Sequence, residues 1–127
     1  AWFFIWRRQM GLDSNAYAVP AGTTYDPETA EDIKYWRKNN ALHGWMERLY
    51  IANGGTEMFN CVPLQLTAEN LKQLRKDIKA NELTPTEGFF FGEQTYTEDE
   101  KKEDLAFVKL ALMHVDNGSD IYYSSWW

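Results

Sequence analysis

A helix signal runs directly into a strand signal across residues 97–126, TEDEKKEDLAFVKLALMHVDNGSDIYYSSW. The first four residues, Thr97-Glu98-Asp99-Glu100, form a capping box, in which the first and fourth side chains each bond the other's backbone N–H group. The apolar residues that follow predict a helix to about Val115. Asp116-Asn117-Gly118 indicates a turn. Residues 121–126 then predict a final strand whose alternate aromatic side chains face the core and the surface.

Two further helices are predicted upstream of this stretch. Thr67 is typical of a helix N-cap, and apolar residues at helical spacing continue to about Ala80. The pair Asp26-Pro27 is a second start signal, because aspartate caps a helix and proline fits its first position. This helix should run from about residue 27 to Ala52, and Gly54-Gly55 should end it.

Short β-prone segments lie between the predicted helices, at residues 13–19, 58–66 and 89–91. Pro63 restricts the second of them to a sheet edge or an irregular segment. With the final strand, the order becomes strand, helix, strand, helix, strand, helix, strand. We therefore predict an α+β fold with a small, mainly antiparallel sheet covered by three helices. The alternative is a mostly helical domain with a marginal sheet.

The composition is typical of a single soluble domain. Of the 127 residues, 44% are hydrophobic and 25% are charged, which excludes a disordered tail, a collagen-like fibre and a disulfide scaffold. The net charge is −6, which argues against binding of nucleic acid or anionic lipid unless a basic patch is segregated from the acids.

The one cysteine, Cys61, agrees with a reducing cytoplasm and is expected to be a plain buried thiol. No run approaches the roughly 20 apolar residues that span a bilayer. We expect a cytoplasmic protein that contacts no membrane.

Residues 1–9, AWFFIWRRQ, differ from the rest and are interpreted as an apolar N-terminal extension ahead of a single domain at 10–127. Met10 is then the expected natural start. The two arginines follow the apolar run. A signal peptide instead carries its positive charge before the apolar run, and that run is longer. We expect the extension to pack as an added strand or to form a contact between copies.

The predicted helix over residues 27–52 carries the main candidate site. Asn39 lies in the middle of its apolar face, His43 lies one turn later, and Trp36 and Glu47 continue the margin of that face. A buried amide is costly without partners. The group is therefore either a structural polar network or a pocket for a small polar ligand, with Trp36 as one wall.

Residues 85–92, PTEGFFFG, are the second candidate segment. The three phenylalanines between glycines predict a buried strand, and the alternative is a ligand-facing edge with Thr86 and Glu87 as polar contacts. The segment lacks the spacing of a phosphate loop. His43 and Glu47 are four apart, but the sequence offers no third metal ligand. We therefore predict no metal, no cofactor and no catalytic group.

Three surfaces bear on partners. The predicted second helix carries a basic run, Lys72, Arg75, Lys76 and Lys79, whose ordinary meaning is a solvated helix face. The last helix has little polar surface in its second half, so it is either fully buried or part of a homodimer. The aromatic excess of 16%, which includes the final strand, suits a protein partner.

Several separated blocks carry a resemblance. They are Met10-Gly11-Leu12-Asp13, the pattern YWRKxNxxHxW from Tyr35 to Trp45, PTxGFFFG at 85–92 and Tyr122-Tyr123-Ser124-Ser125-Trp126. Together they resemble a family of small uncharacterised proteins of phage and bacterial genomes. The resemblance extends from Met10 onward and implies a phage or accessory cytoplasmic setting without assigning any chemistry.

Two functions remain open from the sequence. The first is a small, phage-associated, non-enzymatic binding module that acts on a protein partner. The second is a small-ligand-binding protein or enzyme with a pocket around Asn39 and His43, where a histidine performs acid–base work or only hydrogen-bonds the ligand.

Overall fold

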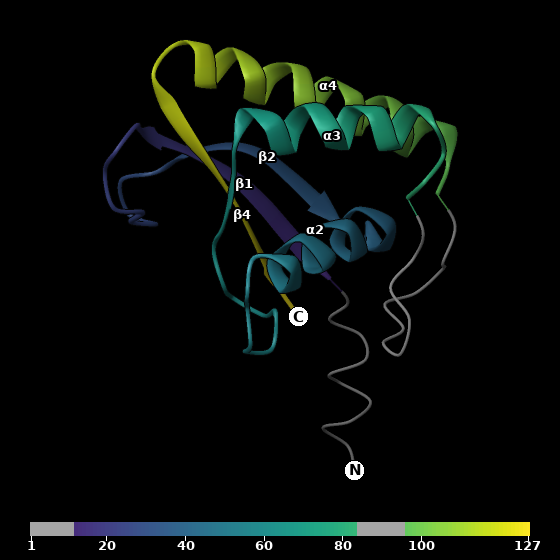
Figure 1. Cartoon of the computed structure of the whole chain (residues 1–127), viewed down its shortest axis with the longest axis horizontal. Coiled ribbons are helices and arrows are strands. Elements are labelled where there is room, and N and C mark those ends of the chain that lie inside the picture. The colour runs from purple at the N-terminus through teal and green to yellow at the C-terminus, as the bar shows by residue number, and fades with distance from the viewer. Residues whose placement is uncertain (1–11, 84–95) are drawn as a thin grey trace.

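A four-stranded antiparallel sheet in the order β2-β1-β4-β3 and three helices form the fold. The computed structural model describes residues 12–83 and 96–127 (Figure 1). The elements are β1 Asp13–Pro20, β2 Glu31–Arg37, α2 Asn40–Ala52, β3 Leu64–Leu66, α3 Ala68–Lys79, α4 Glu98–Asp116 and β4 Ser119–Trp126. The predicted α+β fold with three helices is confirmed. The N-terminal extension at 1–9 and the predicted strand at 89–91 lie outside the described residues.

The first and last strands form the centre of the sheet. β1 and β4 pair along their whole length, from Asp13 opposite Trp126 to Pro20 opposite Ser119. The three-residue β3 pairs with β4 at the edge, where a strand that follows Pro63 is tolerated. β2 forms the opposite edge and pairs with β1, with a shift in register between Ala16 and Tyr17.

The helix predicted over residues 27–52 is wrong in its first half. Asp26-Pro27 starts only a single turn, in which the N–H groups of Thr29 and Ala30 bond the Asp26 carbonyl. The chain then forms β2, because the neighbouring strand β1 pairs with it along Glu31–Arg37. Lys38 adopts a left-handed backbone conformation (φ 58°) that ends the strand, and Asn39 caps the helix that follows. Trp36 therefore lies on a strand and not on the helix of His43.

The two later helices begin where the sequence predicts. Thr97 and Glu100 form the predicted capping box, with the Glu100 N–H 3.1 Å from the threonine oxygen and the Thr97 N–H 2.9 Å from the glutamate. Thr67 caps α3 in the same reciprocal way with Asn70. α3 and α4 run antiparallel and side by side (Figure 1).

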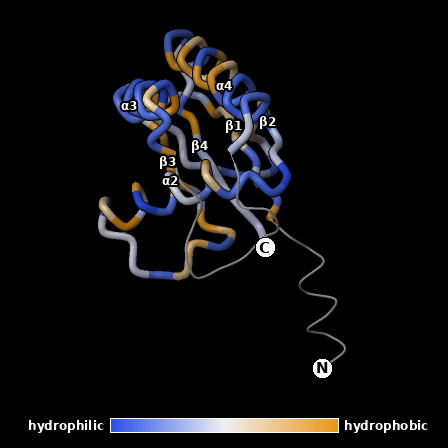
Figure 2. The backbone as a smooth tube through the Cα atoms, turned by 90° about the vertical axis from the view of Figure 1, so that its right-hand side faces the viewer, coloured by the Kyte–Doolittle hydropathy of each residue, from blue (hydrophilic) through white to orange (hydrophobic). Residues whose placement is uncertain are grey.

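All three helices pack on one side of the sheet. Sheet residues that alternate along β1, β3 and β4 meet the apolar faces of the helices in a single core. Figure 2 shows α2 and α3 displaced to one side of β1 and β2. An aromatic cluster lies within this core, with Phe59 and Phe107 buried beside Tyr123 and Trp36. A hydrogen bond links α2 to α3, since the Trp45 indole nitrogen donates to the Asp77 carboxylate at 2.9 Å.

None of the helices in the described part of the chain is long and apolar enough to cross a bilayer.

Candidate functional site

A buried carboxylate, Asp104 of α4, is the centre of the polar network predicted around Asn39. It accepts hydrogen bonds from the Trp36 indole at 2.9 Å and from the Tyr96 hydroxyl at 2.6 Å. The Asn39 amide nitrogen lies 3.1 and 3.0 Å from its two oxygens. Three neutral donors from separate segments therefore converge on one fully buried side chain.

The electrostatics of Asp104 follow from its position. Burial raises the pKa of this carboxyl to about 6, and the hydrogen bonds from Tyr96, Asn39 and Trp36 oppose that rise by stabilising the charged form. Burial and the same carboxylate hold the pKa of Tyr96 well above its usual range, so its hydroxyl acts as a donor. The network is a polar junction between β2, the start of α2 and α4.

Asp104 was not among the sequence candidates, although a signal for it exists. It has the same helical phase as Phe107, Val108 and Ala111, all of which are buried. An aspartate on the same face of a helix as its core residues indicates a buried carboxylate, which must be stabilised by hydrogen-bond donors. Its partners could not be deduced, since Asn39 is 65 positions away.

His43 belongs to a second chain of polar contacts. Its Nδ1 lies 3.2 Å from the Tyr123 hydroxyl, which donates to the Ser14 oxygen at 2.9 Å. The imidazole also stacks on Phe59, with ring centroids 5.2 Å apart. Burial lowers the pKa of His43 to about 4, so the ring is neutral at pH 7. Within the described residues, the Asn39 side chain bonds Asp104, whereas the His43 ring contacts Tyr123.

The remaining sequence candidates are not brought together with these groups. Glu47 is half-buried on α2 and joins neither network. Thr86 and Glu87 lie outside the described residues. Within residues 12–83 and 96–127, no group of three or more His, Cys, Asp or Glu could hold a metal ion. Cys61 is exposed, so the expected buried thiol is wrong. The residue lies ahead of β3, where the backbone is left-handed (φ 62°), and not in a buried strand.

No family model, no curated protein and no solved structure matches this chain. Its surfaces must therefore be interpreted from their own chemistry.

The opposite side of the sheet presents a surface that no described helix covers, which we call the open face. Its strand residues alternate with the buried ones and include Asp13, Asn15, Tyr17, Asp32, Tyr35, Tyr122, Ser124, the exposed Trp126 and one cation, Arg37. Its carboxylates accept hydrogen bonds from neutral neighbours. Asp13 accepts from the Tyr35 hydroxyl at 2.6 Å, and Asp32 accepts from the Asn15 amide at 3.1 Å.

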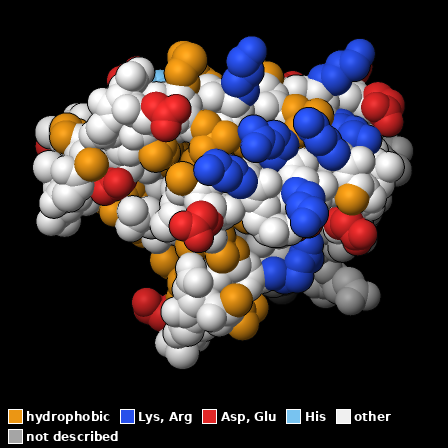
Figure 3. Space-filling view, turned by 45° about the horizontal axis from the view of Figure 1, so that its top comes forward, with side chains coloured by type: hydrophobic (Ala, Val, Ile, Leu, Met, Phe, Trp, Pro, Cys, Tyr) orange, Lys and Arg blue, Asp and Glu red, His pale blue; other side chains and the backbone are white. Residues whose placement is uncertain are grey.

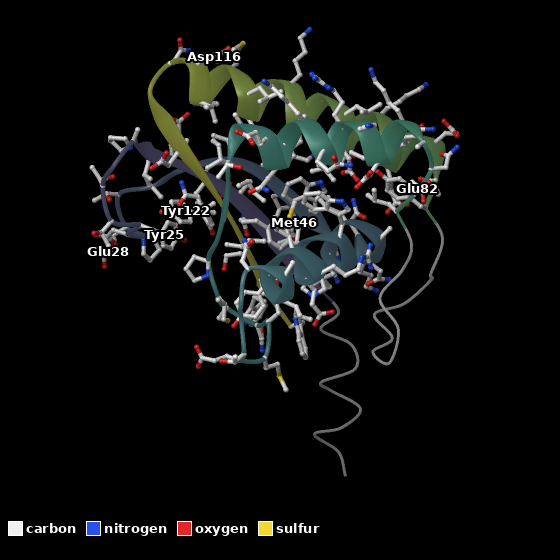
Figure 4. All side chains as sticks on the ribbon, in the orientation of Figure 1. Tyr25, Glu28, Met46, Glu82, Asp116 and Tyr122 are labelled. Atoms are coloured by element: carbon white, nitrogen blue, oxygen red, sulfur yellow. The ribbon has the colours of Figure 1, made fainter. Side chains whose placement is uncertain are left out.

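Three tyrosines, Tyr17, Tyr25 and Tyr122, form a cluster on this face, which we call the tyrosine cluster. Tyr17 and Tyr122 are register partners on β1 and β4. The loop before β2 brings Tyr25 onto them, with ring centroids 5.7 Å from Tyr17 and 5.0 Å from Tyr122. Figure 4 shows Tyr25 and Tyr122 side by side, at a distance from Met46 in the core. All three residues are half-buried, so their rings remain accessible.

The field at the tyrosine cluster is negative. Partial burial raises the pKa of the Tyr17 hydroxyl, and the Asp32 carboxylate raises it further. The pKa of Tyr25 is raised by partial burial, by Tyr17 and by the carboxylates Asp26 and Asp32. Burial, the largest cause of both shifts, opposes either charge, whereas the Asp26 and Asp32 carboxylates favour a cation at the same place.

Proposed function

We propose that this protein is a non-enzymatic interaction module that binds a cationic segment of a partner protein on its open face. The tyrosine cluster carries the proposal, because it gathers three accessible aromatic rings on a sheet surface without a described helix over it. Tyrosine is enriched in protein interfaces, where it supplies a large contact area and a polar tip.

The chemistry of the cluster favours arginine or lysine in the partner. A cation over a tyrosine ring gains about 0.5–1 kcal/mol at an exposed site and more when water is excluded. Asp32 and Asp26 add attraction beside the rings. In the described part of the chain, the one ion pair joins Lys34 to Glu103 and leaves these carboxylates available to an incoming charge.

The buried networks support the same proposal by a different route. Asp104 and His43 are almost fully buried, and their polar atoms bond side chains of neighbouring elements, which suits a scaffold under the open face. The pocket around Asn39 and His43 stays a prediction, since Thr86 and Glu87 lie outside the described residues. The predicted homodimer also stays open, with Met113 as an exposed apolar residue of α4.

The proposed cellular location of this activity rests on the resemblance of four sequence blocks to a family of small phage and bacterial proteins. That resemblance supports a phage or bacterial origin and a cytoplasmic partner, in agreement with the single cysteine, Cys61.

The experiment is a titration of the isotope-labelled protein with a peptide of alternating arginine and glycine, followed by amide chemical shifts. We expect the shifts to concentrate at Tyr17, Tyr25 and Tyr122. A peptide of the same length with neutral citrulline should not produce them. Tyr25→Ala should weaken binding about fivefold, which corresponds to about 1 kcal/mol. Tyr25 lies on the loop between β1 and β2, so this variant should leave the sheet intact.

A matched pair of charge variants separates this site from general attraction to an acidic protein. Asp32→Asn and Asp116→Asn remove the same charge, the first beside the tyrosine cluster and the second from the exposed end of α4. Only Asp32→Asn should weaken peptide binding. Equal losses in both variants, or shifts spread over all acidic surfaces, would contradict the proposal.

A further inference from the structure

We propose that α3 and α4 form a second docking surface, which binds the phosphate backbone of a double-stranded nucleic acid. This surface lies on the helical side of the molecule, away from the open face. It consists of six exposed cations, which we call the basic ridge: Lys72, Arg75, Lys76 and Lys79 of α3 with Lys102 and Lys109 of α4. Figure 3 shows Lys and Arg side chains gathered over these helices.

Helical spacing aligns these charges. The four cations of α3 fall at intervals of three and four, so they form one stripe beside the core residues Leu71 and Leu74. Lys72 and Lys79 are about 10 Å apart along the helix axis at 1.5 Å per residue. Lys102 and Lys109 are two turns apart on the antiparallel neighbour and form a second row. Two adjacent rows of cations match the repeated charges of a phosphate backbone.

The cations of the basic ridge are available, because none of them forms an ion pair within the described residues. The acids of the same two helices keep their charge, but they bond other groups or lie at the helix ends. Asp77 accepts from Trp45 and Gln73, Glu100 caps α4, and Asp104 is buried in its network. Glu103 forms the one ion pair of the described residues, with Lys34 at 2.7 Å. The other acids of the two helices are within two residues of an end of α3 or α4: Glu69, Glu98, Asp99 and Asp116.

The composition of the basic ridge favours nucleic acid over an acidic protein. Lysine is depleted from protein interfaces, which are enriched in aromatic residues, whereas lysine and arginine are the side chains that contact phosphates. The ridge also offers no platform for unpaired bases. Phe107 is the one Phe, Tyr or Trp of α3 and α4, and it is buried, so these helices expose no Phe, Tyr or Trp ring on which a base could stack. A duplex bound through its backbone fits this surface best.

The net charge of −6 predicts no binding of nucleic acid unless a basic patch is segregated from the acids. The fold segregates the charges only locally, since α3 and α4 together carry seven cations and eight acids. The six exposed cations lie together, and Glu69, Glu98, Asp99 and Asp116 lie near the helix ends. The carboxylates of the open face are separated from the basic ridge by the sheet and by helices about 10 Å thick. At physiological salt, ions in the surrounding water screen exposed charges beyond about 8 Å, which weakens the interaction between the two surfaces.

The test is fluorescence anisotropy of a labelled DNA duplex of about 20 base pairs, titrated with protein between about 50 and 200 mM salt. We expect weak, sequence-independent binding, with a Kd of about 10⁻⁵ M at the lower salt concentration. The logarithm of the binding constant should fall with the logarithm of salt with a slope of about −5, since each of the six cations neutralises one phosphate and contributes about −0.9. Lys72→Gln/Lys76→Gln should weaken binding at least tenfold and reduce the slope by about 2.

Lys38→Gln/Arg48→Gln is the matched control, because it removes the same charge from exposed positions outside α3 and α4. Its binding should stay within about twofold of wild type, and thermal melts should show that both double variants fold. Equal weakening by the two double variants would overturn the proposal. So would the absence of duplex binding at about 100 μM protein. Tighter binding of single-stranded DNA or of polyglutamate than of the duplex would replace it with a single-strand or an acidic-protein site.

Discussion

Asn39 and Asp104 are 65 positions apart in the chain, yet the amide nitrogen of the first lies 3.1 and 3.0 Å from the two carboxylate oxygens of the second. The amide oxygen of Asn39 accepts the Leu42 N–H at 3.1 Å and so caps α2. The Asn39 side chain therefore has two roles. Its amide oxygen caps the start of α2, and its amide nitrogen attaches that start to α4.

Substitutions of Asn39 should separate these two roles. Asn39→Ala removes both the cap and the bond to Asp104, and we expect it to lower the free energy of unfolding by about 2 kcal/mol. Asn39→Ser keeps a capping oxygen without reaching Asp104, and it should lose about half as much. Urea unfolding at pH 7 measures both values. Equal losses would show that only one of the two roles stabilises the fold.

Asp104 and His43 should have opposite effects on stability as the pH changes. The pKa of Asp104 is raised from 3.8 to about 6, so its contribution is fully present below pH 3.8 and is lost as the pH rises through 6. The pKa of His43 is lowered from 6.5 to about 4, so its contribution is present above pH 6.5 and is lost as the pH falls through 4. Between about pH 4 and 6.5, these two contributions to the stability of the wild type should largely cancel.

Single variants should reveal the two slopes. In Asp104→Asn, only the His43 contribution remains, and the free energy of unfolding should then rise by about 2–3 kcal/mol from pH 4 to 6.5. His43→Gln leaves Asp104 alone, and the free energy should fall by a similar amount over the same range. Urea titrations at several pH values measure both slopes. Slopes of the same sign in the two variants would refute the assignment of opposite pH-dependent contributions to Asp104 and His43.

Tyr123→Phe should remove a hydroxyl without disturbing the aromatic cluster. The ring is stacked on Phe59 with centroids 6.0 Å apart, and the hydroxyl links Ser14 to His43. We expect a loss of about 1–2 kcal/mol, because two buried polar groups lose a partner. Tyr122→Phe is the control, since this neighbour faces the other side of the sheet and should lose less than about 0.5 kcal/mol. Thermal or urea unfolding compares them.

Gly55→Ala should be destabilising through Tyr50. A Cβ atom at residue 55 would overlap the Tyr50 ring. The ring has little room to move, since it stacks on Phe59 at 5.0 Å and its hydroxyl accepts the Glu57 N–H at 3.1 Å. We expect a loss of about 1–3 kcal/mol. In a Tyr50→Ala background, the same substitution should cost much less, and a double-mutant cycle measures the difference. An unchanged cost would place its origin elsewhere.

Local signals were sufficient for α3, α4 and the central strands. Thr67 and Thr97 mark their helices because capping is decided within four residues. The helix predicted from residue 27 failed because its start signal at Asp26-Pro27 is satisfied by a single turn. Pairing with β1 then outweighs helix formation over Glu31–Arg37.

The candidate site was predictable only in part. A polar group in the middle of an apolar face indicates a buried network, and Asn39 and His43 are both buried and hydrogen-bonded. The partner Asp104 depends on how α4 packs against β2 and α2, which no local pattern specifies. The tyrosine cluster depends on the register of β1 and β4 and on the path of the loop that carries Tyr25.

The sheet order also has a consequence for biosynthesis. β4 comes last in chain order but lies between β1 and β3, and it is the strand with which β3 pairs. While a ribosome is still translating α4, the nascent chain can form the β1–β2 hairpin, but β3 has nothing to pair with. The apolar faces of α3 and β3 are then uncovered, so we expect the domain to depend on chaperones and to reach its native state only once β4 has emerged from the ribosome.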